Sequence, residues 1–319
     1  MSTSCNTPNT PRSADPATNH AEIEQLKTIL DTYPNVVIGA GSGLSAAAGL
    51  TYSGARFKQY FSDFERTYGF HDMYTGGFYP YQTPEAYWAF WSRSVWINRY
   101  APIPKDTYDV LRELVEHKNY FVLTTNVDHC FQRSGFDKER LFYTQGDYGL
   151  FQCSEPCCKQ TWDNEESIKA MVLAQGFEIT ADNTLILPER ITPTMTVPHD
   201  LIPYCPHCGK PAEMNLRIDA TFVEDAGWYA ASKQYNQYLQ TQTDQEQPLL
   251  FLELGVGLNT PGIIKYPFWE MTAKDKQAYY ACLNAQVPYV PNSIQKRSTV
   301  IVADIDTTLR LLTTCHPSV

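Results

Sequence analysis

A short apolar run that ends in a glycine-rich turn constrains the fold of this chain more than any other feature of its sequence. The run, Asn35–Gly39, reads as a buried parallel strand. Gly41–Gly49 follows and consists mostly of glycine and other small residues, so it should turn the strand into a helix. Such glycines let the backbone approach a pyrophosphate, whose charge is favoured at a helix N-terminus. A tight turn that holds no ligand is an alternative of about equal weight for this cluster alone.

Strands and helices alternate along most of the chain. Further apolar strands are expected at Tyr120–Thr124, Leu141–Thr144, Leu249–Leu254 and Thr299–Ala303, and helices at Ala21–Tyr33, Asp106–His117 and Asp304–Leu312. The last helix opens with an acidic cap. This alternation predicts an α/β fold with a Rossmann-like, doubly wound parallel sheet, in which ligands bind at the carboxyl ends of the strands.

Two segments interrupt the alternation. Residues 57–100 are dense in Tyr, Phe and Trp and are expected to form helices, whose aromatic side chains are interpreted as core rather than as an acyl pocket. Residues 147–217 hold clustered cysteines, prolines and polar loops. We expect both to form a smaller zinc-binding and helical lobe, set against a Rossmann-like lobe of residues 21–56, 101–146 and 218–319. Residues 1–20, rich in Ser, Thr, Asn and Pro, are predicted to be a disordered tail, which leaves 21–319 as one folded domain.

Two short-spaced cysteine pairs predict a metal site. Cys153 and Cys157 form the first pair, and Cys205 and Cys208 form the second. Pairs of this kind, separated by a loop, are typical of a closed tetrahedral Zn²⁺ site, which is structural because it has no open position. Cys158 competes with Cys157 for the second ligand position, and His207 is a poorer candidate. Reduced, solvent-facing thiols are the less favoured alternative.

Composition excludes some classes of partner. The formal net charge of −10 argues against a nucleic-acid or anionic-membrane surface, which would need clustered Lys and Arg. No stretch approaches the roughly 20 apolar residues that span a bilayer, and the N-terminal segment has no apolar core of a secretory signal. Cysteine spacing suited to metal rather than to disulfides indicates a reducing compartment, so we expect a cytoplasmic protein.

Polar side chains follow several of the predicted strands. Thr124–Asp128 ends one strand and Thr144–Gly146 ends the next, while Glu253–Pro261 forms another strand-to-glycine turn. Because the carboxyl ends of parallel strands meet at one edge of a sheet, these groups should converge on a crevice. Asn and Gln side chains there can form hydrogen bonds with ribose hydroxyls. Asp128 can accept a hydrogen bond from an amide such as the carboxamide of nicotinamide. Taken alone, each of these residues could equally be an ordinary strand-end cap or turn residue without a ligand.

Taken in order, these residues resemble the sirtuin family. Gly41-Ser-Gly-Leu-Ser-Ala-Ala-Ala-Gly-Leu50 is similar to its G-A-G-I-S-x-x-S-G-I, and Thr125-Asn-Val-Asp128 to its Q-N-I-D. Gln145-Gly146 stands where the family has H-G, and Gly255-Val-Gly-Leu258 is similar to G-T-S-L. The resemblance runs from about Val36 to the C-terminal helix and implies NAD as the cofactor.

The departures from the family resemble one subgroup. The P-D-F-R of sirtuins becomes Thr51-Tyr-Ser-Gly54, with Arg56 displaced, and the catalytic histidine becomes Gln145. These changes resemble the macrodomain-linked, or class M, sirtuins, which are protein mono-ADP-ribosyltransferases. That resemblance implies a lipoylated, glycine-cleavage H-protein-like carrier as the acceptor and a macrodomain hydrolase that reverses the modification.

The resemblance also implies roles for individual residues. Asn126 and Gln145 would form the catalytic pair, with Asp128 on the nicotinamide amide. The first cofactor loop would comprise Gly41, Ser42, Gly43, Ser45 and Gly49, the second Gly255, Gly257 and Asn259, with further contacts from Arg56, Thr125, Asn284 and Asp304. His71 and His129 are interpreted as surface or hydrogen-bonded core histidines rather than as replacement bases.

The chemistry of Gln145 agrees with this subgroup. Sirtuin deacylation needs a general base on a ribose hydroxyl, and a glutamine amide has no proton-accepting state near neutral pH. General-base catalysis is worth ~10²–10⁴-fold, so deacylation should suffer more than ADP-ribosyl transfer to an acceptor that needs no base. An NAD-dependent lysine deacylase is the second interpretation, and a non-catalytic NAD-binding module is the third.

Overall fold

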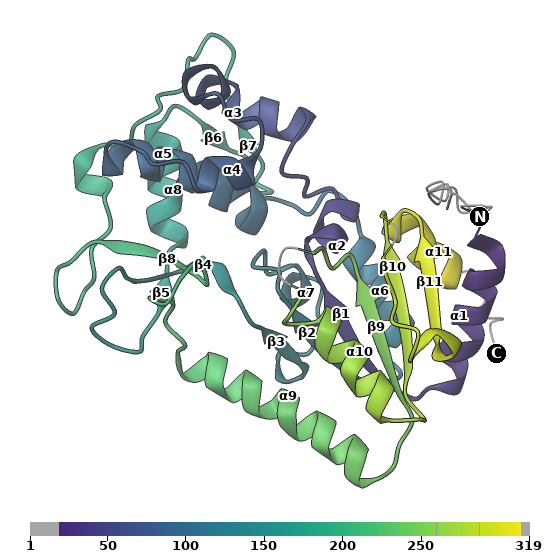
Figure 1. Ribbon diagram of the computed structural model, residues 1–319. Coiled ribbons are helices and arrows are strands. Elements are labelled where there is room, and N and C mark those ends of the chain that lie inside the picture. Colours follow the sequence, from purple (N-terminus) through teal and green to yellow (C-terminus); the bar gives the residue numbers. More distant parts are fainter. Residues whose placement is uncertain (1–18, 259–260, 287, 314–319) are drawn as a thin grey trace, which may run out of the picture.

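The computed structural model describes residues 19–258, 261–286 and 288–313. Its centre is a six-stranded sheet in the order β11-β10-β9-β1-β2-β3, with every neighbouring pair parallel (Figure 1). The strands are β1 (Asn35–Ala40), β2 (Asn119–Thr124), β3 (Leu141–Tyr143), β9 (Leu249–Leu254), β10 (Tyr279–Asn284) and β11 (Ser298–Val302). β1 and β9 are buried along their whole length, as expected for strands covered on both faces. The predicted Rossmann-like parallel sheet is therefore confirmed.

Five of these strands lie where the sequence predicts them, and β10 was missed. Its six residues, Tyr279–Asn284, are all buried except the last. A short apolar run of this kind shows no alternation between polar and apolar positions, and so it does not separate a covered strand from a buried helix turn.

Helices cover both faces of the sheet. On one face, a core of aliphatic side chains joins the sheet to α1 (His20–Thr32), α2 (Ser42–Ala47), α6 (Thr107–Val115), α7 (Cys130–Arg133) and α11 (Ile305–Thr313). On the other face, an aromatic-rich core packs beneath α9 (Ala226–Asp244) and α10 (Lys265–Lys274). The sheet is thus doubly wound.

The first two described residues, Asn19 and His20, fall in the segment predicted to be a disordered tail. Asn19 is buried and its side-chain amide donates to the carbonyl of Val302, 3.1 Å away, while α1 begins at His20. Asn19 and His20 therefore belong to the folded part, because this hydrogen bond ties the start of α1 to the last strand. Residues 1–18 of the predicted tail lie outside the described residues.

The segment 57–100 is helical, as predicted. It forms α3 (Ala55–Tyr68), α4 (Met73–Gly77), α5 (Pro84–Val95) and a π-helical turn, η2 (Trp96–Tyr100), which pack with α8 (Glu165–Ala174) around an aromatic core. Arg93 is fully buried in this core, where its guanidinium contacts both carboxylate oxygens of Asp63 at 2.9 Å. Most aromatic side chains of the segment are core, whereas Tyr74 on α4 and Phe78, directly after α4, are exposed.

Residues 147–217 contain short strands that sequence reasoning treated as loops. β4 (Gly146–Cys153) lies between β5 (Trp162–Asp163) and β8 (Ala212–Leu216) in an antiparallel sheet. β6 (Glu178–Ile179) and β7 (Leu185–Ile186) form a separate hairpin, and the 3₁₀ turns are η3 (Lys138–Arg140), η4 (His199–Leu201) and η5 (Gln295–Arg297). Figure 1 shows this part of the chain, with α3, α4, α5 and α8, beside the parallel sheet rather than within it.

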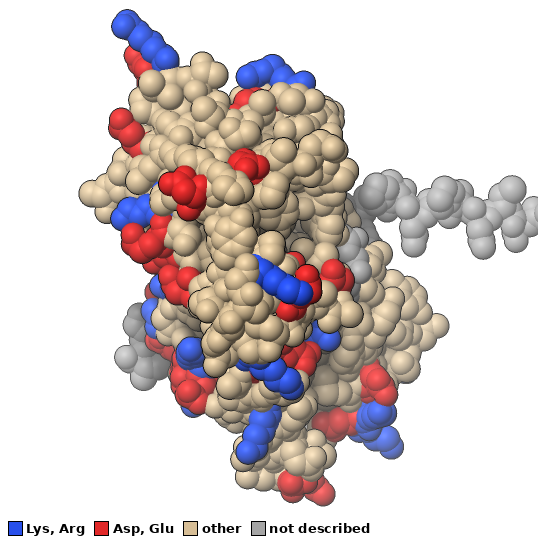
Figure 2. All heavy atoms as spheres, turned by 90° about the vertical axis from the view of Figure 1, so that its left-hand side faces the viewer, with Lys and Arg blue, Asp and Glu red and all other residues tan. Residues whose placement is uncertain are grey.

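Within the described part of the chain, none of the helices combines the length and apolar character needed to cross a membrane. Figure 2 shows the face formed by the smaller lobe, on which Lys and Arg stand singly or beside Asp and Glu. This face therefore carries no continuous basic patch of the kind that binds nucleic acid.

Candidate functional site

Two glycine turns cross at the carboxyl edge of the sheet. One follows β1 and contains Gly41 and Gly43, and the other follows β9 and contains Gly255. The Gly41 amide donates to the carbonyl of Leu254 at 3.0 Å, and the Gly43 amide donates to that of Gly255 at 2.9 Å. A Cβ on Gly43 would lie 2.7 Å from the Gly255 Cα, so only glycine allows this approach. The two turns thus form a single backbone cradle.

Side chains from two segments meet beside this cradle. Ser45, on α2, donates to Asp128 with 2.5 Å between its Oγ and Oδ2, and Asp128 Oδ1 also accepts the amide of Cys130 at 3.0 Å. Asn126 donates from Nδ2 to the Gly41 carbonyl at 3.1 Å. All three side chains are buried. The side chains that follow β2 therefore reach the first glycine turn, with Ser45 as the link between Asp128 and α2.

The backbone places Gln145 next to Asn126. Thr144 donates its amide to the carbonyl of Thr124 at 2.9 Å, and Tyr148 donates its amide to that of Val127 at 2.8 Å. The segment between these two bonds, which includes Gln145, therefore runs alongside the segment that includes Asn126. Gln145 is half-buried, and its carbonyl accepts the amide of Arg217 at 3.0 Å.

Arg56, at the start of α3, donates to the carbonyl of Thr51, just after the first glycine turn, at 3.0 Å. Its guanidinium donates to the Asn98 side chain at 2.9 Å and to the Ile97 carbonyl at 2.8 Å, which anchors the start of α3 to η2. Nearby, the hydroxyls of Tyr52 and Tyr148 lie 2.9 Å apart, and burial raises the pKa of Tyr148 to about 12. Tyr52, not the displaced Arg56, reaches across to β4.

His129 is hydrogen-bonded rather than free. Its Nδ1 lies 2.5 Å from Asp147 Oδ2, and Asp147 Oδ1 accepts from Arg99 Nε at 2.8 Å and from the Gly149 amide at 2.7 Å. Burial raises the pKa of Asp147, but the hydrogen bond from His129 and the charge of Arg99 outweigh it, so this pKa lies below its usual value. His71 is exposed and pairs with Glu65 at 2.7 Å. Neither histidine is a free base at the cradle.

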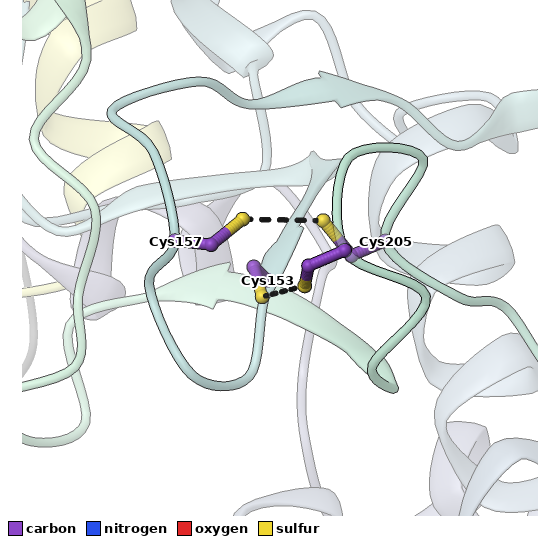
Figure 3. A group of neighbouring side chains, drawn as sticks. Cys153, Cys157 and Cys205 are labelled. Carbon is purple, nitrogen blue, oxygen red and sulfur yellow. Dashed lines mark hydrogen bonds between the residues drawn. The ribbon is translucent and has the colours of Figure 1, made fainter.

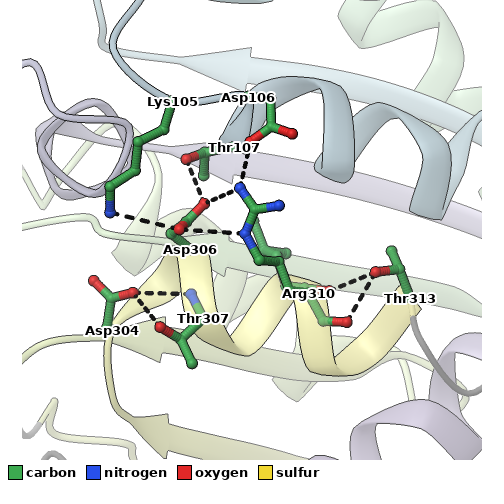
Figure 4. A network of polar contacts seen from close by, with 9 residues as sticks. Lys105, Asp106, Thr107, Asp304, Asp306, Thr307, Arg310 and Thr313 are labelled. Atoms are coloured by element: carbon green, nitrogen blue, oxygen red, sulfur yellow. Dashed lines mark hydrogen bonds and ion pairs between the residues drawn. The ribbon is translucent and has the colours of Figure 1, made fainter.

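The remaining predicted cofactor residues are spread around the cradle. Thr125 donates its amide to the Ala40 carbonyl at 3.1 Å, and Asn284 donates from Nδ2 to the Val256 carbonyl at 3.1 Å, bracing the second turn. Ser42 and Gly257 are exposed. Asp304 accepts a hydrogen bond from the amide of Thr307 at 2.8 Å (Figure 4). Asp304 is therefore the acidic cap that the sequence predicts at the start of α11. Asn259 lies outside the described residues.

The four predicted cysteines come together in space. The Sγ atoms of Cys153, Cys157, Cys205 and Cys208 all lie within 4.8 Å of one another. The Sγ atoms of Cys153 and Cys208 lie 3.6 Å apart, and so do those of Cys157 and Cys205. Figure 3 shows the side chains of Cys153, Cys157 and Cys205 gathered between two loops. A tetrahedral Zn²⁺ with Zn–S bonds of about 2.3 Å sets its sulfurs about 3.8 Å apart, so the cluster fits zinc.

The structure also decides between the candidate ligands. Cys157 belongs to the cluster and Cys158 does not, and His207 instead contacts Gln160 at 2.7 Å. Burial raises the pKa of Cys205, but the amides of His207 and Cys208 lower it to about 6, which favours a thiolate. The cluster joins the end of β4 to the loop before β8, so zinc here would be structural.

Sequence reasoning missed several residues of this region. Tyr108, on α6, is fully buried and its hydroxyl contacts Ser45 at 3.0 Å and Asn126 at 3.4 Å. Tyr52 and the Arg99–Asp147 ion pair were also missed. Asp147 directly follows the Gln145-Gly146 motif, so its position next to the motif could have identified it as a site residue. No motif or spacing in the sequence marks Tyr108.

Comparisons with known proteins identify the family. No family model matches the chain. A "Protein ADP-ribosyltransferase" of Staphylococcus aureus is 38% identical over 294 residues, which cover 92% of this chain and 87% of that protein. A "Probable bifunctional ADP-ribose hydrolase/ADP-ribosyltransferase" of Fusarium oxysporum is 29% identical over 237 residues, 73% of this chain and 37% of that protein.

Among solved structures, the similarity is to sirtuins. A Sir2 bound to an acetylated peptide has a TM-score of 0.52 at 17% identity, and a Sir2 mutant with a p53 peptide and NAD has a TM-score of 0.51 at 16% identity. Each comparison covers 92% of this chain and 97% of the other. At such identity the likeness shows the fold, and the bacterial relative shows that the fold here belongs to an enzyme. The chain is therefore a member of the sirtuin-like protein ADP-ribosyltransferases, NAD-dependent enzymes with a cysteine cluster suited to structural zinc.

Proposed function

We propose that this enzyme transfers ADP-ribose from NAD to a lipoylated carrier protein similar to the glycine-cleavage H protein. The general activity follows from the bacterial relative, and the choice of carrier rests on the resemblance to class M sirtuins. The observation that carries the proposal is the glutamine at position 145, beside Asn126, where a deacylase needs a histidine. The histidine nearest in sequence to Asn126 among those described, His129, is bound to Asp147 and offers no replacement.

The residues at the cradle fit NAD. A Cβ on Gly41, Gly43 or Gly255 would lie within 2.5–2.8 Å of backbone atoms of the opposing turn, so glycine at these positions lets the two turns pack backbone to backbone. The turns lie at the carboxyl edge of the parallel sheet, where folds of this kind bind the pyrophosphate of a dinucleotide. Asp128 and Asn126 supply a carboxylate and an amide beside it. NAD would supply the ADP-ribosyl group, and nicotinamide would be the leaving group of the transfer.

The chain's own residues favour transfer over deacylation. Asn126 is held by two hydrogen bonds and can orient a ribose hydroxyl, which contributes through positioning rather than proton transfer. Gln145 can donate or accept a hydrogen bond but cannot take a proton near neutral pH. An acceptor that reacts as a carboxylate requires no base, whereas deacylation loses ~10²–10⁴-fold without one.

The test compares carriers directly. The enzyme is incubated with NAD and a lipoylated H-protein-like carrier, with unlipoylated carrier and an acetylated peptide in parallel, while intact mass and nicotinamide release are recorded. The proposal expects one ADP-ribose on the lipoylated carrier only, lost in Asn126→Ala. An unchanged carrier together with a deacetylated peptide would show that the enzyme is a deacylase instead.

We also propose that a macrodomain hydrolase removes the modification. The fungal relative is named as a bifunctional ADP-ribose hydrolase and ADP-ribosyltransferase, so the two activities are joined in that protein. The present chain matches 37% of its length. Adding a purified macrodomain hydrolase to the modified carrier should restore the unmodified mass, and a stable modification would contradict this pairing.

A further inference from the structure

Tyr108 is fully buried and contacts two polar residues beside the cradle, although it belongs to none of the sequence motifs. It is 0% exposed, lies in the first turn of α6, and its hydroxyl stands between Ser45 and Asn126 at 3.0 and 3.4 Å. Burial, together with the negative charge of Asp128, raises its pKa well above the usual value, so the hydroxyl keeps its proton. A buried hydroxyl with two partners is in a position to set their orientation.

The start of α6 is held from two sides. Thr107, also 0% exposed, donates to Asp306 of α11 with 2.7 Å between Oγ1 and Oδ1, within the polar network that Figure 4 shows. On the other side, Lys105 donates its amide to the Ala48 carbonyl at the end of α2, 3.1 Å away. Tyr108 is therefore fixed relative to both α11 and the first glycine turn.

The direction of each proton in this network is determined. Ser45 donates its only hydroxyl proton to Oδ2 of Asp128. In its contact with Ser45, Tyr108 must therefore be the donor. The Tyr108 oxygen is then free to accept, and its second partner is Asn126 Nδ2. The chain of donors thus runs from Asn126 through Tyr108 and Ser45 to Asp128.

This direction settles which way the Asn126 amide faces. Both Nδ2 protons are used, one toward the Gly41 carbonyl and one toward Tyr108. The opposite orientation would set Oδ1 against two acceptors, which is unfavourable. Oδ1 is consequently the atom that Asn126 offers to a ligand, and it can accept from a hydroxyl group.

We propose that Tyr108 is a positioning residue, which holds Asn126 with its amide oxygen toward a ribose hydroxyl of NAD and completes the hydrogen-bond chain to Asp128. The inference rests on NAD as the cofactor of this site. It concerns the ribose next to nicotinamide and not the adenosine half of the cofactor. Removing the Tyr108 hydroxyl should therefore weaken the binding of ligands that contain this ribose and leave unchanged the binding of ligands that lack it.

The test compares Tyr108→Phe with Tyr279→Phe. Tyr279 is a matched control because it is also buried, and its hydroxyl lies 2.9 Å from Thr299 and 3.0 Å from Gln25, in the same core but in strand β10. Dissociation constants for NAD, ADP-ribose and ADP are measured by calorimetry, with kcat and KM for nicotinamide release and the Tm of each variant.

Tyr108→Phe should raise the dissociation constants of NAD and ADP-ribose about tenfold, which corresponds to the loss of one good hydrogen bond, and change that of ADP by no more than about twofold. The kcat for nicotinamide release should fall further than KM rises, while Tyr279→Phe should match the unmodified enzyme in every binding constant. Unchanged NAD binding and kcat in Tyr108→Phe, or equal loss of all three ligands, would overturn the proposal.

A second variant covers the case in which Tyr108→Phe does not fold. Ser45→Ala breaks the same chain at its next member, and the proposal expects it to weaken NAD and ADP-ribose but not ADP. Where both single variants fold, the double variant should lose no more than the larger single loss, because the two residues act through one chain. If the unmodified protein failed to bind NAD at all, the assigned cofactor, and not only the role of Tyr108, would be wrong.

Discussion

Gly43 and Gly255 touch backbone to backbone, and this contact joins the two turns that flank the centre of the sheet. The amide of Gly43 donates to the Gly255 carbonyl at 2.9 Å, and a Cβ on Gly255 would lie 2.5 Å from the Gly43 carbonyl carbon. Gly255 also has φ = 63°, a left-handed conformation that favours glycine. Position 255 therefore excludes a side chain for two independent reasons.

Gly255→Ala should weaken NAD binding more than tenfold and lower the free energy of unfolding by roughly 2 kcal/mol or more, because left-handed strain and a backbone clash add. Gly69→Ala is the matched control. Gly69 has φ = 80° but nothing lies within 4 Å of its Cβ position, so it should lose about 1 kcal/mol and keep its NAD affinity. Calorimetry and urea unfolding measure both variants. Equal NAD affinity in the two would contradict a role for the crossing turns in binding.

Removal of zinc should disrupt the smaller lobe. Cys205→Ser deletes one ligand of the cluster and is expected to abolish stoichiometric zinc and lower the Tm, because a metal held by the four cysteines would join the end of β4 to the loop before β8. Cys158→Ser should keep both the zinc content and the Tm, since Cys158 lies outside the cluster. Elemental analysis and thermal unfolding distinguish them, and zinc loss in the Cys158 variant would reverse the ligand assignment.

Gln145→His should restore a proton acceptor beside Asn126. We expect NAD-dependent deacetylation of a peptide to rise from near background, within the ~10²–10⁴-fold range of general-base catalysis, and transfer to the carrier to persist or decline. Liquid chromatography of the peptide and intact mass of the carrier report the two reactions. His129→Gln serves as the control and should not reduce deacetylation in the Gln145→His background, because His129 is bound to Asp147. Deacetylation that depends on His129 would show that the wrong residue was assigned as the base.

The Asp147 carboxylate should make stability depend on pH in the acid range. Its pKa is lowered in the folded protein, so it contributes stability that is fully present above its unfolded value of about 3.9 and is lost as the pH falls through the lower folded value. Asp147→Asn should therefore flatten the decline in unfolding free energy below about pH 4 and reduce stability at pH 7. Urea unfolding from pH 3 to pH 7 measures the slope. An unchanged slope in the variant would mean that Asp147 does not carry this dependence.

Features that depend on local residue types were predictable from the sequence. The strands β1, β2 and β9 each contain a run of apolar residues without the alternation of a half-exposed strand, which predicts strands covered on both faces, and the acidic Asp304 marks the start of α11. The cysteine pairs are close in the chain, so their spacing alone indicates a metal site. The replacement of histidine by Gln145 is likewise a property of one position.

Contacts between distant segments were decided only by the tertiary structure. The choice of Cys157 over Cys158 depends on the direction of neighbouring side chains, and the hydroxyl of Tyr108 reaches the cradle from a helix that no motif marks. Gly43 and Gly255 meet because β1 and β9 are neighbours in the sheet although they are far apart in the chain. Local patterns determine which elements form, whereas the packing of those elements determines which side chains share a site.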